Sequence, residues 1–229
     1  MRKMWCVCLA CMMLCAALSG CGKAASSEAS GASAGSDASA GSASTQTVVQ
    51  EKEYAPGTRT DTAYTSEWLG LTYTLSENMV MASDDEINSM MQTGAETLYE
   101  DSAEGQKMLD YANISTVYEM LAVDMANGGN VLVAAEKLAL SGTTEEQYIA
   151  ALKQQFSGLN VSTAFNDPTT RDVCGITFKE LSYTMKTDDG TSTNQTALIK
   201  KVGDRMACIM LTYSDETVLN ALLTGFSAL

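Results

Sequence analysis

The sequence predicts an α/β fold of the α+β type, in which a mainly antiparallel sheet is covered by helices on both faces as an α/β/α sandwich. Two long apolar runs, residues 115–124 and 131–140, flank the turn sequence Asn127-Gly128-Gly129-Asn130, which is a strong hairpin signal. In both runs the odd-numbered and the even-numbered positions are largely apolar, as expected for central strands with two covered faces. Apolar residues repeat at helical spacing in three other segments, so three helices can supply the cover.

The first part of the predicted domain contains strands and a helix. The globular part is expected to begin near Tyr64, and the alternating residues 71–75 predict a strand after a turn at Leu69-Gly70. Ser83 and Glu86 form a predicted capping box, and the acids between them suit a helix N-terminus. The buried face of this helix is predicted to carry Ile87, Met90, Met91, Ala95 and Leu98. Residues 102–112 are ambiguous.

The second part alternates again between helix and strand. Thr143 and Glu146 form another predicted capping box, and Gly158 is the expected end of that helix. Its buried stripe is predicted to be Tyr148, Ile149, Leu152 and Phe156. Predicted strands follow at 161–165, 176–186, 196–202 and 205–213, with turns at Asp188-Asp189-Gly190 and Gly203-Asp204. Ser214 is expected to cap a last helix that carries Val218, Leu219, Leu222, Leu223 and Phe226.

The N-terminus has the layout of an export signal. Arg2 and Lys3 precede an apolar run over residues 4–18, which is too short for the roughly 30 Å hydrocarbon core of a membrane. Residues 1–20 are therefore predicted to be a cleaved signal peptide. The sequence Leu18-Ser19-Gly20-Cys21 resembles the lipobox of bacterial lipoproteins, which implies a diacylglyceryl group on Cys21 and cleavage just before it. The alternative is that Cys21 is one more cysteine of a cysteine-rich signal.

The predicted organisation has three parts. Residues 21–62 would be the lipidated cysteine and a disordered tether rich in Ser, Gly and Ala, because this composition cannot bury enough apolar surface to offset chain entropy. Residues 63–229 would form a single globular domain. Two acyl chains suffice for stable membrane attachment, whereas one chain binds reversibly. The glycine after Cys21 and the tether composition resemble lipoproteins of Gram-positive bacteria.

The charge of the chain limits its partners. Removing residues 1–20 removes Arg2 and Lys3 but no acid, which leaves 12 of the 14 basic side chains against 28 acidic ones and a net charge of −16. Such a charge opposes binding to polyanions, so neither nucleic acid nor anionic lipid headgroups are expected partners. Attachment to a membrane must therefore depend on the lipid.

No catalytic or metal-binding constellation is visible. The chain has no histidine, which removes the commonest base and metal ligand, and we expect no metal or cofactor. Cys174 and Cys208 remain in the folded part, with three open interpretations: two buried thiols, a disulfide, or a reactive thiol. The segment Asp188 to Ser192 lacks the ligand spacing of a calcium loop and is interpreted as a hairpin turn. A Ser-Lys or carboxylate pair stays open as a catalytic site.

The order of elements and several local patterns resemble the PsbP/Mog-like domain found in many bacterial lipoproteins. The matching stretches are Tyr64 to Leu75, Asn127 to Asn130, Thr143 to Tyr148, Val173-Cys174-Gly175 and Val218 to Phe226. Each is a folding pattern, and none is catalytic. Relatives of this domain in plants assist photosystem II and others bind small GTPases, but no binding residue of those proteins has a counterpart in this chain.

The sequence therefore favours a lipid-anchored extracytoplasmic lipoprotein that is not an enzyme and that binds an envelope component or protein. The anchor, the tether and the missing catalytic set support this hypothesis. The alternative is a small-molecule or cation carrier at the membrane surface. A hydrolase with an unrecognised Ser-Lys or carboxylate site is a remote third hypothesis.

Overall fold

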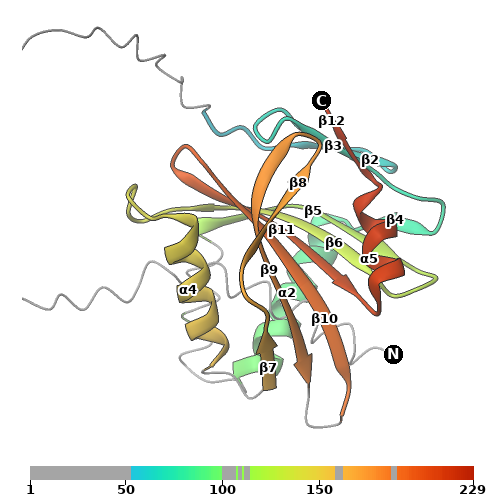
Figure 1. Cartoon of the computed structure of the whole chain (residues 1–229). Coiled ribbons are helices and arrows are strands. Elements are labelled where there is room, and N and C mark those ends of the chain that lie inside the picture. Colours follow the sequence, from blue (N-terminus) through green and yellow to red (C-terminus); the bar gives the residue numbers. More distant parts are fainter. Residues whose placement is uncertain (1–52, 100–106, 108–109, 111–113, 158–161, 187–189) are drawn as a thin grey trace, which may run out of the picture.

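The computed structural model describes residues 53–99, 107, 110, 114–157, 162–186 and 190–229 (Figure 1). In these residues the strands form two antiparallel sheets. The small sheet has the order β1 (Thr58–Arg59), β2 (Ala63–Ser66), β3 (Leu71–Thr74) and β12 (Phe226–Ala228). The large sheet has the order β4 (Met79–Met81), β5 (Thr116–Asp124), β6 (Asn130–Lys137), β11 (Arg205–Tyr213), β10 (Ser192–Val202), β9 (Ile176–Lys186) and β7 (Ser162–Phe165). A further strand, β8 (Thr169–Val173), also pairs with β9.

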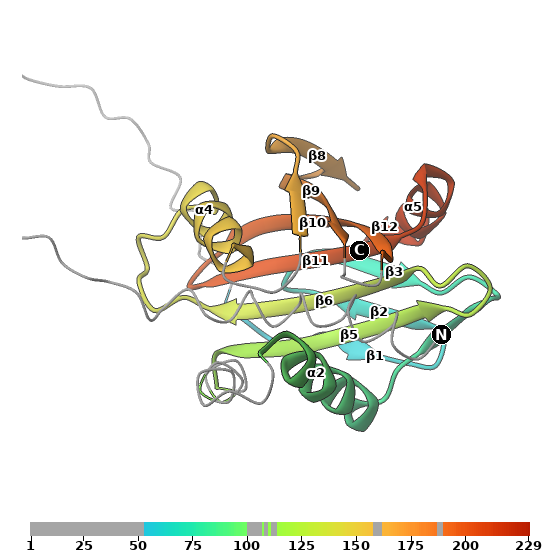
Figure 2. The same ribbon diagram turned by 90° about the horizontal axis from the view of Figure 1, so that it is seen from below.

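Helices and the small sheet cover the two faces of the large sheet. One face packs against α2 (Asp84–Tyr99) and α4 (Glu145–Phe156), which contribute Ile87, Met91, Tyr148, Leu152 and Phe156 to a shared core. The other face packs against the small sheet and α5 (Glu216–Leu223), through Tyr64, Trp68, Tyr73, Leu219 and Leu222 among others. Figure 2 shows α2 and α5 on opposite sides of the large sheet. The predicted α+β class, with a mainly antiparallel sheet and helices on both faces, is confirmed.

The separate small sheet was not predicted, and four short strands are absent from the prediction: β1 and β12 of the small sheet, and β4 and β8 of the large sheet. The strands β1, β4 and β12 have two or three residues, which is too few to give a periodic signal. The strand β8 has one apolar residue, Val173, and therefore no alternation. Phe226, which was assigned to the last helix, instead begins β12.

The start of the fold also differs from the prediction. The described residues begin at Glu53, and β1 pairs with β2 from within the segment assigned to the tether. Tyr54 packs its ring against Trp68, which lies in the core of the small sheet. The predicted boundary at residue 63 therefore falls inside the first hairpin.

The second predicted apolar run, residues 131–140, is longer than the strand that it forms. The strand β6 stops at Lys137, and Leu140 is exposed.

Two of the three predicted helix caps are shifted by one residue. Ser83 and Glu86 form the predicted capping box before α2, since Glu86 Oε2 accepts from the Ser83 amide at 2.8 Å. The box before α4 consists of Thr144 and Gln147 instead of Thr143 and Glu146. Asp215, not Ser214, caps α5 by accepting from two amides of its first turn. The predicted buried stripe of α4 is confirmed.

Several predictions fall outside the described residues. These are the signal peptide, Cys21 and most of the tether, most of the ambiguous segment 102–112, Gly158, and Asp188 and Asp189 of the predicted turn. The side chains of Ala95 and Leu98 are likewise not described. In the part of the chain that the structure describes, no helix has the length and apolar character needed to cross a membrane.

Candidate functional site

The two cysteines of the folded part lie in different environments. Cys174 is exposed in the turn between β8 and β9, whereas Cys208 is buried on β11, in the core shared with α2 and α4. Both are thiols, so the structure does not contain the disulfide that was one of the three interpretations. Cys174 is also not the buried thiol that a second interpretation assumed. The structure does not bring these residues together as a site.

A candidate site lies instead on the hairpin formed by β8 and β9. Val173 pairs with Ile176, so Cys174 and Gly175 are the two central residues of a tight turn. Both have positive φ, 56° and 83°, as in a type I′ hairpin turn. The carboxylate of Asp172 supports the turn by accepting from the Gly175 amide at 2.9 Å. In Figure 2 this hairpin rises from the large sheet between α4 and α5.

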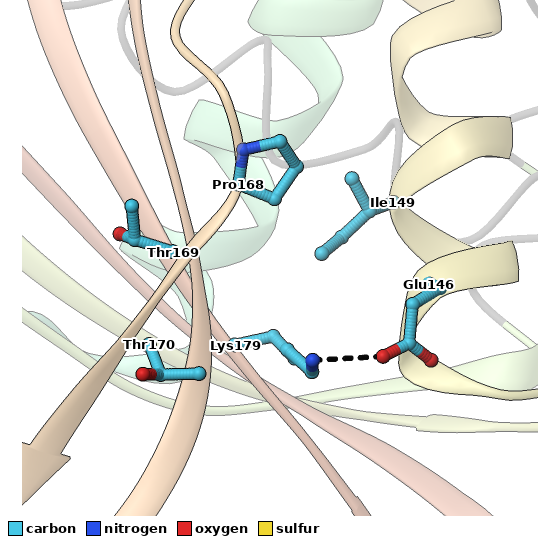
Figure 3. Close-up of a pocket in the computed structure, with 6 residues that line it drawn as sticks. All are labelled: Glu146, Ile149, Pro168, Thr169, Thr170 and Lys179. Atoms are coloured by element: carbon cyan, nitrogen blue, oxygen red, sulfur yellow. Dashed lines mark ion pairs between the residues drawn. The ribbon is translucent and has the colours of Figure 1, made fainter.

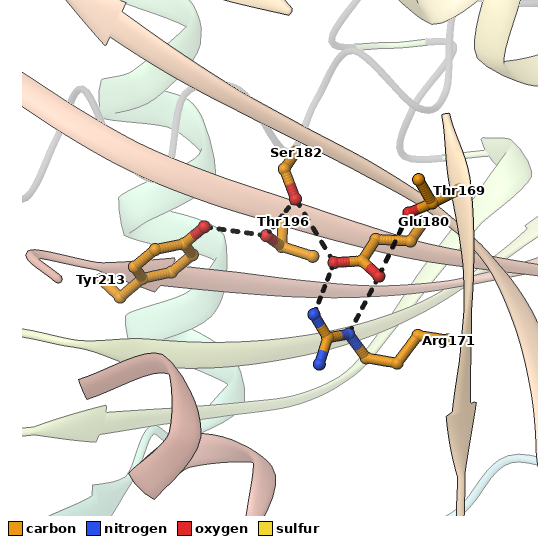
Figure 4. A network of polar contacts seen from close by, with 6 residues as sticks. All are labelled: Thr169, Arg171, Glu180, Ser182, Thr196 and Tyr213. Atoms are coloured by element: carbon orange, nitrogen blue, oxygen red, sulfur yellow. Dashed lines mark hydrogen bonds and ion pairs between the residues drawn. The ribbon is translucent and has the colours of Figure 1, made fainter. Parts of the chain in front are cut away.

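One side of the hairpin carries a hydrogen-bonded polar face, formed by Thr169, Arg171, Glu180, Ser182, Thr196 and Tyr213 (Figure 4). Arg171 and Glu180 form a bidentate ion pair, with Nε to Oε2 at 3.0 Å and Nη2 to Oε1 at 2.8 Å. The Glu180 side chain is only 10% exposed, and the hydrogen bonds that Arg171 donates to its carboxylate raise the pKa of Arg171 above its usual value. Such paired, planar hydrogen bonds fix the orientation of both side chains.

The polar face continues from Glu180 across the sheet. Ser182 Oγ lies 3.4 Å from Glu180 Oε1 and 2.8 Å from the Thr196 hydroxyl. The Thr196 hydroxyl is in turn 3.0 Å from the Tyr213 hydroxyl, and both residues are buried. Side chains from β8, β9, β10 and β11 are thereby joined in one chain of hydrogen bonds. The accessible part of the polar face consists of Thr169, Arg171 and Ser182, and it is preorganised because the buried members hold it in one arrangement.

The other side of the hairpin forms a cleft against α4. This α4 cleft has a volume of about 400 Å³ and is lined by Glu146, Ile149, Pro168, Thr169, Thr170 and Lys179 (Figure 3). Strand alternation explains the division, since Lys179 and Glu180 are neighbours on β9 and point to opposite faces. The volume lies within the range of small-molecule sites, and like them the cleft is lined by more apolar than polar surface.

An ion pair controls the electrostatics of the α4 cleft. Lys179 Nζ lies 2.8 Å from Glu146 Oε1. The hydrogen bond from Lys179, together with the α4 N-terminus, lowers the pKa of Glu146 to about 2. The same contact raises the pKa of Lys179 above its usual value. Lys179 is therefore protonated at neutral pH, which opposes a role as the base of a Ser-Lys or Thr-Lys catalytic pair.

The remaining sequence-based site hypotheses concern metals. Within the described ranges, no three His, Cys, Asp or Glu side chains gather in a way that could hold a metal ion. Of the segment interpreted as a turn rather than a calcium loop, Gly190 is described and has a φ of 84°, which suits a turn.

Sequence reasoning did not find the β8–β9 hairpin as a site. A signal was present in Val173-Cys174-Gly175-Ile176, where a two-residue turn separates two β-branched residues. Cys-Gly is an unusual choice for a type I′ turn, in which Asn-Gly and Asp-Gly predominate. Pro168 was interpreted as the end of the strand at residues 161–165, whereas in the structure it directly precedes β8.

Comparisons with known proteins find similarity in structure only. No family profile and no curated protein matches the sequence. Among solved structures, cyanobacterial PsbP (CyanoP) from Synechocystis sp. PCC 6803 is 10% identical over 77% of this chain and 98% of that one, with a TM-score of 0.45. A protein from Bacteroides thetaiotaomicron is 10% identical over 73% of this chain and 48% of that one, with a TM-score of 0.39. LpqN, involved in cell envelope biogenesis of Mycobacterium tuberculosis, is 7% identical over 69% of this chain and 82% of that one, with a TM-score of 0.38. Membership of the PsbP/Mog-like family stays a prediction.

Proposed function

We propose that this protein is a lipid-anchored extracytoplasmic lipoprotein whose domain is a non-catalytic binding module, and that it binds an envelope protein through the β8–β9 hairpin. The observation that carries the proposal is the preorganised polar face. Its charged and hydroxyl groups hold each other in place, so binding would cost little additional ordering of side chains. A surface of this kind favours a protein partner with complementary polar groups.

The lipid anchor is tested by replacing Cys21 with alanine. We expect Cys21→Ala to leave the membrane fraction while its circular dichroism spectrum stays that of the wild type, because the domain begins more than 30 residues later. An uncut signal peptide would also retain the chain at the membrane, so mass spectrometry must show that residues 1–20 are absent. A processed Cys21→Ala chain that stays membrane-bound would contradict the proposed anchor.

The contact surface is tested by a matched pair of variants. Thr169 and Thr74 are both exposed strand threonines, but Thr169 lies on the polar face of the hairpin and Thr74 on the small sheet. We expect Thr169→Arg to reduce photo-crosslinking of the full chain to its partner in host membranes, and Thr74→Arg to leave the yield unchanged. Equal yields for the two variants would show that the hairpin is not the contact surface.

A second candidate function is a carrier of a small polar molecule, which the α4 cleft favours by its volume. Native mass spectrometry of the chain purified from host cells would then show an additional bound mass. Thr170→Trp, which would fill part of the cleft, should remove that mass. A clean apo mass in the wild type would exclude the carrier function.

A further inference from the structure

A buried carboxylate lies between the two sheets, away from the β8–β9 hairpin. Glu119 is the extra residue of a bulge in β5, since Tyr118 pairs with Ala134 and Met120 already pairs with Val133. The bulge turns Glu119 toward the small sheet, where its side chain is almost completely buried. Its Oε2 accepts from the Tyr64 hydroxyl at 2.5 Å and from the Gly57 amide at 2.8 Å.

Residues 53–57, which we name the strap, lie over this carboxylate. The strap forms neither helix nor strand. Its Tyr54 ring meets the Trp68 ring edge to face at a centroid distance of 5.1 Å, and the Arg205 guanidinium lies 3.9 Å from the Tyr54 ring centroid. Burial raises the pKa of Tyr54, and the negative charge of Glu119 raises it further. The Tyr54 phenol therefore occupies a slot formed by Trp68, Glu119 and Arg205.

The fit of the strap in this slot is incomplete. Two buried donors of the cluster, Trp68 Nε1 and Arg205 Nε, have no protein partner in the described residues. The Tyr54 hydroxyl faces the Glu119 carboxylate, and a hydrogen bond between them also raises the pKa of Tyr54. Buried polar groups in native proteins almost always have a partner. The strap thus gains ring contacts but leaves these two donors unpaired. A segment that made the same ring contacts and also satisfied these atoms would bind the slot better.

The chemistry of the slot selects its ligand. A cation would be repelled by Arg205 and an anion by Glu119, and a purely apolar group would leave the polar atoms unpaired. An extended peptide supplies carbonyl acceptors for Trp68 Nε1 and Arg205 Nε. A tyrosine in that peptide reproduces the ring contacts. We propose that the strap is a displaceable cover and that the slot beneath it binds a tyrosine-containing peptide segment of a partner protein.

Binding in trans tests this proposal. Trp5 and Trp68 are the two tryptophans of the chain, so Trp5→Phe makes Trp68 the only tryptophan reporter. In a full chain that also carries Tyr54→Ala, the probe is a blocked peptide with the strap sequence, Glu-Tyr-Ala-Pro-Gly-Thr. We expect this peptide to shift Trp68 fluorescence saturably. The matched peptide with alanine in place of tyrosine should bind at least about tenfold more weakly, a difference of about 1.4 kcal/mol.

Controls distinguish specific binding in the slot from nonspecific peptide binding and from misfolding of the variants. The chain that retains Tyr54 should bind the same peptide about tenfold more weakly, because its own strap competes. Equal binding of the tyrosine and alanine peptides would overturn the proposal. Hydrogen exchange in the wild type gives an independent readout, since the Gly57 amide should exchange by local opening, faster than the amides of β5 and β6. Exchange of the Gly57 amide only with global unfolding would show that the strap is a permanent part of the core. The same would follow from a crystal structure in which fixed waters satisfy both donors, together with a peptide that fails to bind.

Discussion

At the scale of single residues, the β8–β9 turn depends on an unfavourable backbone conformation. Cys174 has a φ of 56° and is the one residue other than glycine with positive φ in the described part of the chain. The left-handed conformation costs most residues about 1–2 kcal/mol, and asparagine tolerates it better because its short polar side chain bonds locally. The thiol of Cys174 is exposed and does not offset this cost by packing.

The first prediction follows from this turn. Cys174→Asn should stabilise the protein by about 0.5–1 kcal/mol, because Asn-Gly is a preferred pair in type I′ turns. The midpoint of chemical denaturation would measure the gain. Cys174→Val is the matched control and should destabilise the protein, since a β-branched residue is the least suited to positive φ. A destabilising Cys174→Asn would contradict the assigned turn.

A second residue-scale prediction concerns the pH dependence of the α4 cleft. The pKa of Glu146 lies at about 2, below its usual value of 4.5, so its contribution to stability is complete above about pH 4.5 and is lost as the pH falls toward 2. An NMR titration of the Glu146 carboxyl carbon should show this low midpoint. In Lys179→Met the midpoint should move back toward 4.5, because the hydrogen bond from Lys179 is the largest cause of the shift. A wild-type midpoint near 4.5 would mean that the ion pair does not form in solution.

At the scale of elements, the N-cap of α4 lies one residue after the position predicted from the sequence. The sequence Thr143-Thr144-Glu145-Glu146-Gln147 contains two overlapping capping boxes, Thr143 with Glu146 and Thr144 with Gln147. In the structure Thr144 Oγ1 accepts from the Gln147 amide, and Gln147 Oε1 accepts from the Thr144 amide at 2.9 Å. This choice leaves Glu146 available for its ion pair with Lys179. Tertiary contacts thus decide between two locally acceptable caps.

The third prediction concerns the N-cap of α4, and the neighbouring Thr143 provides the control. Thr144→Ala should destabilise the protein by about 1 kcal/mol, the usual cost of losing a threonine N-cap. The same substitution at Thr143 should change stability by less than about 0.5 kcal/mol. Thermal or chemical denaturation of the two variants would measure both. If Thr143→Ala proved the more destabilising, the cap would be one residue earlier in solution than in the structure.

Length and apolar alternation together explain which elements could be predicted. The hairpin of β5 and β6 was predicted because both strands are long and Asn127 to Asn130 favour a turn. The strands β9, β10 and β11 have nine residues or more and were also predicted. The polar face could not be predicted, because Glu180 and Arg171 become neighbours only when the unpredicted β8 pairs with β9. The bulge that turns Glu119 inward likewise depends on its pairing with β6.

At the scale of the whole molecule, the small sheet connects the two ends of the described fold. Its outer strands are β1, at Thr58–Arg59, and β12, at Phe226–Ala228. Tyr73 and Phe226 pack edge to face across β3 and β12 at a centroid distance of 4.7 Å. The core beneath this sheet contains side chains of both sheets and of α5. The small sheet, the large sheet and α5 therefore share one core.

The fourth prediction tests the packing of the small sheet at Gly225, between α5 and β12. A β-carbon at Gly225 would lie 2.5 Å from Tyr73 and 2.9 Å from the backbone oxygen of Thr74. Gly225→Ala should therefore destabilise the protein by about 1–3 kcal/mol through overpacking. Gly142→Ala is the matched control, since nothing lies within 4 Å of the new carbon there. Equal denaturation midpoints for the two variants would contradict the tight approach of β12 to β3.

The strap over Glu119 has a mechanical consequence. A pulling force applied to the chain before Glu53 reaches the fold first at Tyr54 and Gly57. Behind these residues, β1 pairs with β2 through Thr58 and Arg59 alone, which is a short ladder to resist tension. The long central ladders of the large sheet resist the force better, so the strap and β1 yield first. The end of the chain nearest any anchor would thus lengthen under tension while the hairpin and its polar face stay folded.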